Sequence, residues 1–238
     1  MLDKVQEIIR VNNETAEKIA ALRQENEQRG KLLEKRMARV AIENVMGRFS
    51  ILYSGGRYRE LMQFFADTEQ ISFQRSDVGV YEGQGAVAGY FANLADHALP
   101  GSFRMMNLTS PVIEMAADGK TAQGMWFING LEAVKDPGDP QVPAADLWIN
   151  DKLAVEFLRT DCGDWRILRM TVCEEMRGRY HKSWGEYSVA PDYPAFDVFP
   201  APTRPSDCHL PFRADRKSQK NLTTPEPHET YSTLCEHF

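Results

Sequence analysis

The chain has 238 residues, of which 42% are hydrophobic and 26% charged, and its formal net charge is −6. These proportions are those of an ordinary globular protein, and the length suits one sizeable core with extensions. The acidic balance argues against nucleic acid as a partner, because phosphate binding usually needs a basic face. No apolar run approaches the roughly 18 residues of a membrane span, so we expect no membrane partner.

Targeting and cofactor signals are absent from the sequence. Residues 1–18 lack the apolar core of a signal peptide, which predicts a cytoplasmic protein. The four cysteines are scattered without a CxxC motif, and in such a chain we expect free thiols. No His, Cys, Asp and Glu grouping has metal-ligand spacing, and no glycine-rich phosphate loop is present, so we expect no metal and no cofactor.

Residues 1–36 are polar and helix-prone, and we treat them as an N-terminal helical arm. Apolar residues from Val5 to Ile19 recur near heptad spacing, with Asn12 interrupting the series, whereas residues 23–30 have no apolar face. Two interpretations stay open, a solvated arm and a short oligomerisation helix, because a coiled-coil prediction requires three or four sustained heptads.

The central region, residues 37–184, combines helical and strand periodicity and predicts an α+β fold. We expect a cone-shaped α+β barrel, in which a curved antiparallel sheet and three helices enclose one pocket. The predicted helices are 37–54, 57–66 and 83–99, and the predicted strands are 69–76, 78–81, 103–116, 121–133, 146–159 and 165–177.

Residues 185–238 differ in composition, since eight of the 13 prolines lie at 191–227 and apolar periodicity is lost. A disordered tail is one interpretation. Scattered aromatic residues such as Phe196, Phe199 and Phe212 favour another, an extended C-terminal arm that packs on its own domain or a neighbour and frays after about residue 215.

Several motifs in order resemble the SnoaL-like branch of the nuclear-transport-factor-two-like superfamily, over about residues 37–184. They are the first helix, GGRYREL, VYEGQGAVAGYF, IEMAADGKTAQGMW and DWRILRM. The resemblance implies homo-oligomers, as dimers or trimers, and pockets that catalyse cofactor-free dehydration, isomerisation or retro-aldol cleavage. Dehydratases of this branch use a Tyr, an Asp and a His–Asp pair. By the resemblance these positions hold Phe49, Ser54, Met106 and Gly130 here, so that machinery cannot be carried over.

Other residues are therefore candidates for the site. Tyr53 lies beside the vacated Asp position, and Arg75 sits in a strand-like stretch where it could hold a phenolate or carboxylate. Tyr81 precedes a glycine turn and could point inward, and His97 lies near the end of the third predicted helix. Each has an ordinary alternative. Tyr53 could be a packed tyrosine at a helix end, and Arg75 a surface charge. Tyr81 could serve strand packing, and His97 could interact with the helix dipole.

Polar residues on the predicted strands are the next candidates. Asn107 and Asn129 interrupt apolar strands, where a buried amide needs a partner that a ligand or the protein itself can supply. One face of strand 146–159 combines Trp148 with Lys152 and would offer an aromatic wall and an amine, if that face lines the pocket rather than solvent. The same face carries Asn150 and Glu156. Phe49, Trp126 and Arg169 complete the predicted substrate-binding set, and the alternative for Arg169 is a cross-strand pair with Glu156.

Three functions follow as hypotheses. The first is a cofactor-independent lyase acting on a hydroxylated aromatic small molecule, with Tyr53, Arg75, Lys152 and His97 as catalytic candidates. Its chemistry would be elimination or retro-aldol cleavage through a quinone methide, as the resemblance to diarylpropane formaldehyde-releasing lyases implies. The second is a non-catalytic binding or assembly module. The third is a ketosteroid-isomerase-like proton shuttle, which needs a buried carboxylate, for which only Glu156 or Glu175 could serve.

Overall fold

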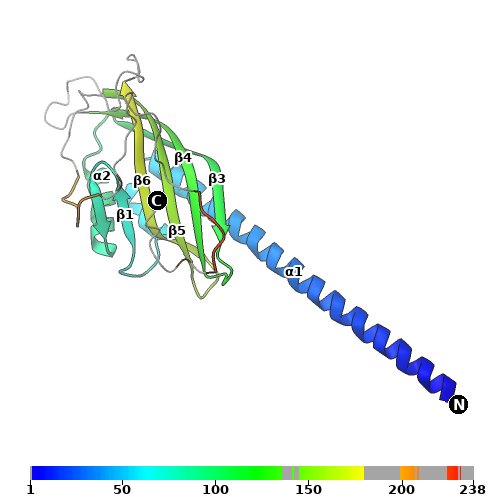
Figure 1. Ribbon diagram of the computed structural model, residues 1–238. Coiled ribbons are helices and arrows are strands. Elements are labelled where there is room, and N and C mark those ends of the chain that lie inside the picture. Colours follow the sequence, from blue (N-terminus) through cyan, green and yellow to red (C-terminus); the bar gives the residue numbers. More distant parts are fainter. Residues whose placement is uncertain are drawn as a thin grey trace.

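The computed structural model describes residues 2–135, 141, 145–179, 199–206, 208, 224–229 and 231. Within these residues the chain forms two α-helices, one 3-10 helix and six strands (Figure 1). The helices are α1 (Leu2–Ser54), η1 (Tyr58–Phe64) and α2 (Gln84–Asp96). The strands are β1 (Ser72–Arg75), β2 (Gly79–Glu82), β3 (Phe103–Met115), β4 (Thr121–Val134), β5 (Ala145–Arg159) and β6 (Trp165–Arg179).

The six strands form one curved, unclosed sheet in the order β2-β1-β6-β5-β4-β3. Four of the five neighbouring pairs are antiparallel, and β1 runs parallel to β6. The predicted cone-shaped α+β fold is confirmed, and the sheet is mixed rather than purely antiparallel. The chain already runs parallel to β6 after η1, where the Ala66 N–H donates to the Ile167 carbonyl at 2.8 Å, and β1 continues in that direction.

Helix α1 is a single continuous helix, so the predicted arm and the predicted first helix are one element. Its N-terminal part projects far from the sheet into solvent (Figure 1). Ion pairs between residues four apart, such as Arg29 with Glu25 and Lys31 with Glu27, stabilise the polar middle part of the helix. It ends at Gly55-Gly56, where Gly56 takes a φ of 71° that suits glycine.

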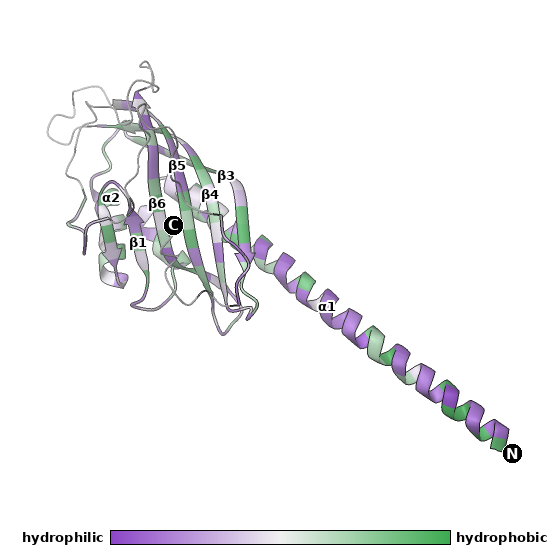
Figure 2. Ribbon diagram, viewed as in Figure 1, coloured by the Kyte–Doolittle hydropathy of each residue, from purple (hydrophilic) through white to green (hydrophobic). Residues whose placement is uncertain are grey.

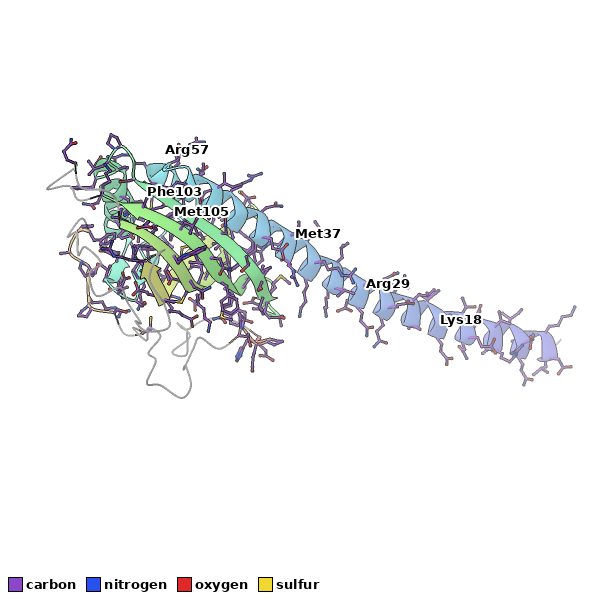
Figure 3. The ribbon with its side chains drawn as sticks, turned by 90° about the horizontal axis from the view of Figure 1, so that it is seen from above. Lys18, Arg29, Met37, Arg57, Phe103 and Met105 are labelled. Atoms are coloured by element: carbon purple, nitrogen blue, oxygen red, sulfur yellow. The ribbon has the colours of Figure 1, made fainter. Side chains whose placement is uncertain are left out.

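The C-terminal part of α1 packs against the concave face of the sheet, as the view from above shows (Figure 3). It buries Ala38, Ile42, Met46, Phe49 and Tyr53, the residues of one helical stripe. The same part of the helix covers the free edge of β3. Two serine hydroxyls one turn apart bind the backbone of Met106, whose N–H and carbonyl face this edge. Ser50 donates to the Met106 carbonyl, and Ser54 accepts from the Met106 N–H at 3.0 Å.

Two described segments of the tail pack on the domain. Thr203 and Arg204 pair with Val80 on β2, with the Val80 N–H donating to the Arg204 carbonyl at 2.9 Å. Near the other end of the chain, the Ala117 N–H donates to the His228 carbonyl at 3.0 Å. The expected fraying after residue 215 is therefore wrong for residues 224–229. The predicted boundary at 184–185 lies outside the described residues.

Candidate active site

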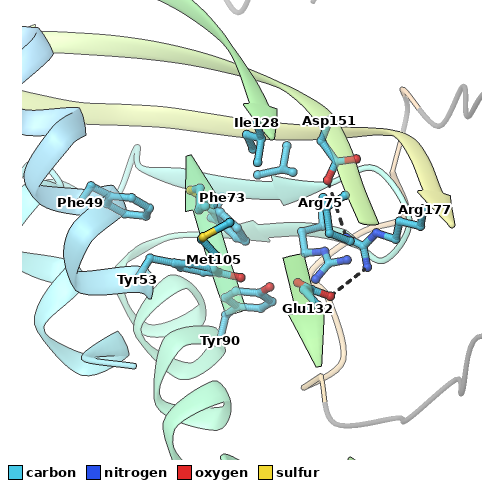
Figure 4. A pocket seen from close by; sticks show the side chains of 13 residues that line it. Phe49, Tyr53, Phe73, Arg75, Tyr90, Met105, Ile128, Glu132, Asp151 and Arg177 are labelled. Carbon is cyan, nitrogen blue, oxygen red and sulfur yellow. Dashed lines mark ion pairs between the residues drawn. The ribbon is translucent and has the colours of Figure 1, made fainter. Parts of the chain in front are cut away.

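A cavity opens on the concave face of the sheet, between α1, α2 and five of the strands (Figure 4). Its volume is about 30 Å³, which is room for about two water molecules. Six polar side chains and seven apolar ones form its wall. The polar ones are Tyr53, Arg75, Tyr90, Glu132, Asp151 and Arg177; the apolar ones are Phe49, Phe73, Met105, Met106, Ile128, Ile149 and Val172.

Two β-bulges in β6 decide which of its side chains face the cavity. The register with β5 skips Leu168 and later Glu175, so each adds one residue to β6 without a partner. A bulge of this kind reverses the alternation of the residues that follow it. Val172 and Arg177 therefore line the same cavity although they are an odd number of residues apart.

The charged residues of the wall belong to a buried ion-pair network. Arg177 is 3% exposed, and its guanidinium lies 2.8 Å from Glu174 and 3.8 Å from both Glu132 and Asp151. Figure 4 marks the pairs with Glu132 and Asp151. Arg177 thus joins three carboxylates from three strands. Such a network is strongly destabilised by the loss of one partner, because the remaining charge is then buried without compensation.

A second arginine, Arg75, is held from two sides. Its Nε and Nη2 atoms donate to Asp77 at 3.0 and 2.5 Å, a bidentate pair. The ring of Phe199, from the tail, lies 4.9 Å from the guanidinium carbon. Burial would raise the pKa of Asp77, but Arg75 and then Arg177 outweigh it and hold that pKa well below its usual range. Arg75 is therefore fixed in place beside a permanently ionised carboxylate.

Asp151 is the acidic group of the wall that titrates near neutrality. It is 2% exposed, and its Oδ1 accepts the Glu175 N–H at 3.2 Å. Burial raises its pKa to about 7, against the opposing effect of Arg177 and with a further rise from Glu174. A carboxyl group with such a pKa can accept and return a proton near neutral pH, as general acid–base catalysis requires.

Two tyrosines project their hydroxyls into the cavity from opposite helices, Tyr53 from α1 and Tyr90 from α2 (Figure 4). Burial raises the pKa of both phenols, which keeps them protonated. A protonated phenol is a hydrogen-bond donor to a ligand oxygen. The Tyr90 ring is fixed by stacking on Phe199, with centroids 5.6 Å apart and planes 6° apart.

Three of the residues predicted from the sequence meet at this cavity: Phe49, Tyr53 and Arg75. Two others are buried but do not line it. Tyr81 donates its hydroxyl to the Pro200 carbonyl at 2.8 Å, and Trp126 packs edge-on against Phe157. These contacts give both residues a structural role in anchoring the tail and filling the core.

The remaining predicted residues lie elsewhere, because the cavity is lined by the other face of β5. Ile149 and Asp151 face inward, so Trp148 and Lys152 point to the outer face, where Lys152 pairs with Glu175 at 3.0 Å. Of the two alternatives left open for the Lys152 face, the structure shows the one that does not line the pocket, so the prediction of Lys152 as a cavity residue is wrong. Asn107 and Asn129 are exposed.

Arg169 and His97 also lie outside the cavity wall. Arg169 donates to Glu156 at 2.7 Å, which is the cross-strand pair considered as its alternative. His97 is exposed at the end of α2, where its Nδ1 lies 2.9 Å from the Asn93 carbonyl. Glu156 and Glu175, the carboxylates considered for a proton shuttle, each pair with a cation on the outer face, and Asp151 takes their place in the cavity.

Four polar residues of the cavity wall were missed from the sequence: Tyr90, Glu132, Asp151 and Arg177. One signal was available, since Asp151 interrupts the apolar face formed by Ile149 and Leu153. A carboxylate at such a position has to be paired or functional. Arg177 gave no signal, because its direction depends on the bulge at Glu175.

The sequence matches the model of the SnoaL-like domain over residues 34–171, which is more than half of the chain. The protein belongs to the SnoaL-like domain family. Residue 34 lies within α1, so the match begins inside the long helix and leaves most of the projecting arm outside it. No curated protein matches the sequence.

Solved structures share this SnoaL-like fold at low sequence identity. A candidate scytalone dehydratase from Novosphingobium aromaticivorans DSM 12444 is 14% identical, with a TM-score of 0.50, and the match covers 62% of this chain and 91% of that one. LinA is also 14% identical, with a TM-score of 0.51 and coverages of 64% and 96%. A type 2 LinA, named as a hexachlorocyclohexane dehydrochlorinase, has 14% identity, a TM-score of 0.50 and coverages of 67% and 98%. At this identity the likeness shows the fold alone.

Proposed function

We propose that the protein is a cofactor-independent lyase that acts on a hydroxylated aromatic small molecule. The observation that carries the proposal is Asp151, a buried carboxyl group that titrates at about pH 7 in the wall of a cavity lined by aromatic side chains. Structural neighbours named as a dehydratase and a dehydrochlorinase support elimination as the class of reaction. Fold likeness alone does not settle chemistry, so the proposal depends on the site.

Each polar residue of the wall has a distinct task in this proposal. Asp151 as the carboxylate accepts the proton of a substrate phenol or alcohol. Arg75 and Arg177 balance the negative charge that develops on the substrate oxygen. Tyr53 or Tyr90, protonated at all relevant pH values, donates a hydrogen bond to the departing oxygen. The aromatic side chains exclude water and pack against the substrate ring.

A para-hydroxyaryl diol illustrates the proposed reaction. Loss of the phenol proton to Asp151 drives electrons through the ring, so that the benzylic C–O bond breaks and a quinone methide forms. The departing hydroxide takes the proton back from Asp151 and leaves as water, which regenerates the Asp151 carboxylate. In a retro-aldol continuation of a 1,3-diol, a hydroxymethyl group on the carbon next to the benzylic carbon loses its O–H proton to the Asp151 carboxylate and leaves as formaldehyde. The electrons of the broken C–C bond form the new C=C bond and restore the phenolate, which takes the proton back from Asp151. A diaryl compound derived from lignin is the most specific substrate we propose.

The size of the cavity favours a second candidate function. A volume of about 30 Å³ does not hold an aromatic ring, so a substrate has to displace side chains. Met105 and Met106, on β3, are the flexible members of the wall and can make room by changing rotamer. If they do not, the protein is a non-catalytic binding or assembly module, as the departures at Phe49, Ser54 and Met106 from the dehydratase pattern also favour.

Ligand-dependent stabilisation separates these functions. We would measure thermal unfolding with a panel of para-hydroxyaryl diols and with the same compounds methylated at the phenol. A ligand at roughly 100 times its dissociation constant adds about 2.7 kcal/mol to stability. The proposal predicts stabilisation by the free phenols that is weakened in Asp151→Asn and kept in Asp146→Asn, an exposed aspartate of the same strand. No stabilisation by any compound would favour the assembly module.

A further inference from the structure

Helix α1 carries a row of large apolar side chains that face solvent. They are between 47% and 79% exposed. We name this row the seam; its members are Leu2, Val5, Ile9, Ile19, Leu33, Met37, Val40 and Ile51. Figure 2 shows hydrophobic residues recurring along the projecting arm. Apolar rows of this length are uncommon on a surface and mark interaction sites.

The seam keeps one heptad frame from the start of α1 to its end. Its members fall on positions that alternate in steps of three and four residues, and the frame resumes in the same register at Leu33. The other positions of the frame hold Asn12, Ala16, Arg23, Asn26, Gly30, Asn44 and Gly47. The sequence alone left the frame uncertain beyond Ile19, because residues 23–30 have no apolar face. The continuous helix connects both halves, so one frame runs over about seven heptads, with an apolar block on each side of residues 23–30.

The seam points away from the protein's own domain. At 100° per residue, its members from Leu33 to Ile51 lie about half a turn from the stripe of Ala38, Ile42 and Met46, which is buried against the sheet. The earlier members lie on the part of α1 that projects beyond the sheet (Figure 1). In the described part of the chain, every residue from 2 to 37 is exposed. An isolated helix with asparagines and a glycine in its interior is marginally stable in water, so the arm needs a partner to hold its form.

We propose that the seam binds the same seam of a second copy of this chain, forming a coiled coil. A second copy offers a row of identical length and spacing, which a heterologous partner would have to match by chance. From Leu2 to Met37, the part of α1 that projects from the domain, the seam and its flanking positions cover about 53 Å and roughly 20 residues per helix, the size of a standard protein interface. Charged residues off the seam, such as Arg10 with Glu7 and Glu14, are neutralised within the helix and leave no field that selects an oppositely charged partner.

The chain offers matched controls beside the seam. Leu32 and Val11 are 52% and 45% exposed, similar to Leu33 and Val5, but lie off the heptad frame. We would measure mass in solution over a hundredfold concentration range for the wild-type chain, for Val5→Glu with Leu33→Glu, and for Val11→Glu with Leu32→Glu. The proposal predicts a self-associating wild type, at least a hundredfold weaker association in the first variant, and little change in the second.

Other results overturn the proposal. A wild-type chain that stays monomeric would show that the seam does not bind a second copy and that its partner is a different molecule. Equal effects of both variants would show that the heptad frame does not determine the association. Association that neither variant changes would place the contact elsewhere on the domain. Circular dichroism would show whether glutamate in the seam unfolds the arm. In that case the same residue pairs would be changed to alanine instead, because alanine keeps the helix propensity high. The seam pair is then expected to weaken association and the control pair to leave it unchanged.

Discussion

Replacing Asp151 with asparagine tests the electrostatics of the cavity through its effect on stability. The side chains have nearly the same shape, and asparagine keeps an oxygen that accepts the Glu175 N–H. The pKa of Asp151 rises from 3.8 to about 7 on folding, so the folded state binds more protons than the unfolded state between these pH values. Stability contributed by this group is therefore present at low pH and lost as the pH rises toward 7.

The expected magnitude follows from that difference. A rise from 3.8 to about 7 corresponds to roughly 4 kcal/mol, lost at up to about 1.4 kcal/mol per pH unit. Asp151→Asn removes this loss. The stability of the variant relative to wild type should therefore increase from pH 4 to pH 7.5, whatever constant offset arises from the weaker contact with Arg177.

Urea unfolding at half-unit intervals of pH measures this difference directly. Other titrating groups, Glu174 among them, are common to both proteins and cancel to first order in the comparison. Two stability curves that stay parallel between pH 4 and 7.5 would refute the reasoning, because Asp151 would then have an ordinary pKa in the folded state. Asp146→Asn, on the same strand but exposed, should give a parallel curve.

Three further predictions concern single contacts. Arg75→Ala should cost about 3 kcal/mol, because it leaves the half-buried Asp77 without its bidentate partner, and adding Asp77→Ala should recover most of the loss in a double-mutant cycle. Ser54→Ala should cost about 1–3 kcal/mol by removing the acceptor of an edge-strand N–H, as chemical denaturation would show; no measurable loss would mean that water replaces the hydroxyl. Cys173 and Cys208, whose sulfur atoms lie 3.6 Å apart, should be joined by a mild thiol oxidant, and peptide mapping that finds only free thiols would contradict that distance.

The fold could be predicted because its signals are local. Alternation of apolar residues defined the long strands, such as 146–159 for β5, within one or two residues of their ends. Helical spacing with Gly55-Gly56 after it fixed the end of α1. The parallel pairing of β1 with β6 could not be predicted from the sequence, since it joins segments far apart in the chain, with Ser72 opposite Arg169.

The site was only partly predictable, because it depends on which face of each strand is concave. Tyr53 and Arg75 were found from their positions beside a helix end and within a strand. Lys152 was misplaced, since period-2 alternation gives two faces without saying which one the helices cover. Arg177 needed the bulge at Glu175, a local change of register that leaves no mark in the sequence.

Other contacts that position the site come from a segment far away in the chain, the C-terminal tail. Phe199 does not line the cavity but packs against Tyr90 and Arg75, which do. Its aromatic side chain favoured packing of the tail on the domain, but the tail has no periodicity that would identify the residues it contacts. The tail is also held by the Tyr81 hydroxyl, which donates to the Pro200 carbonyl at 2.8 Å. The predicted arm therefore contributes to the site through stacking, which sequence patterns do not encode.

The most direct test of the proposed lyase is its turnover of para-hydroxyaryl diols as a function of pH. We predict release of water or formaldehyde by the wild-type protein, with kcat/KM rising through a limb near pH 7 as Asp151 ionises. Asp151→Asn should lose at least a hundredfold of that activity, whereas Asp146→Asn should retain it. Turnover in Asp151→Asn equal to wild type, or none in the wild-type protein with any diol that stabilises it, would contradict the account.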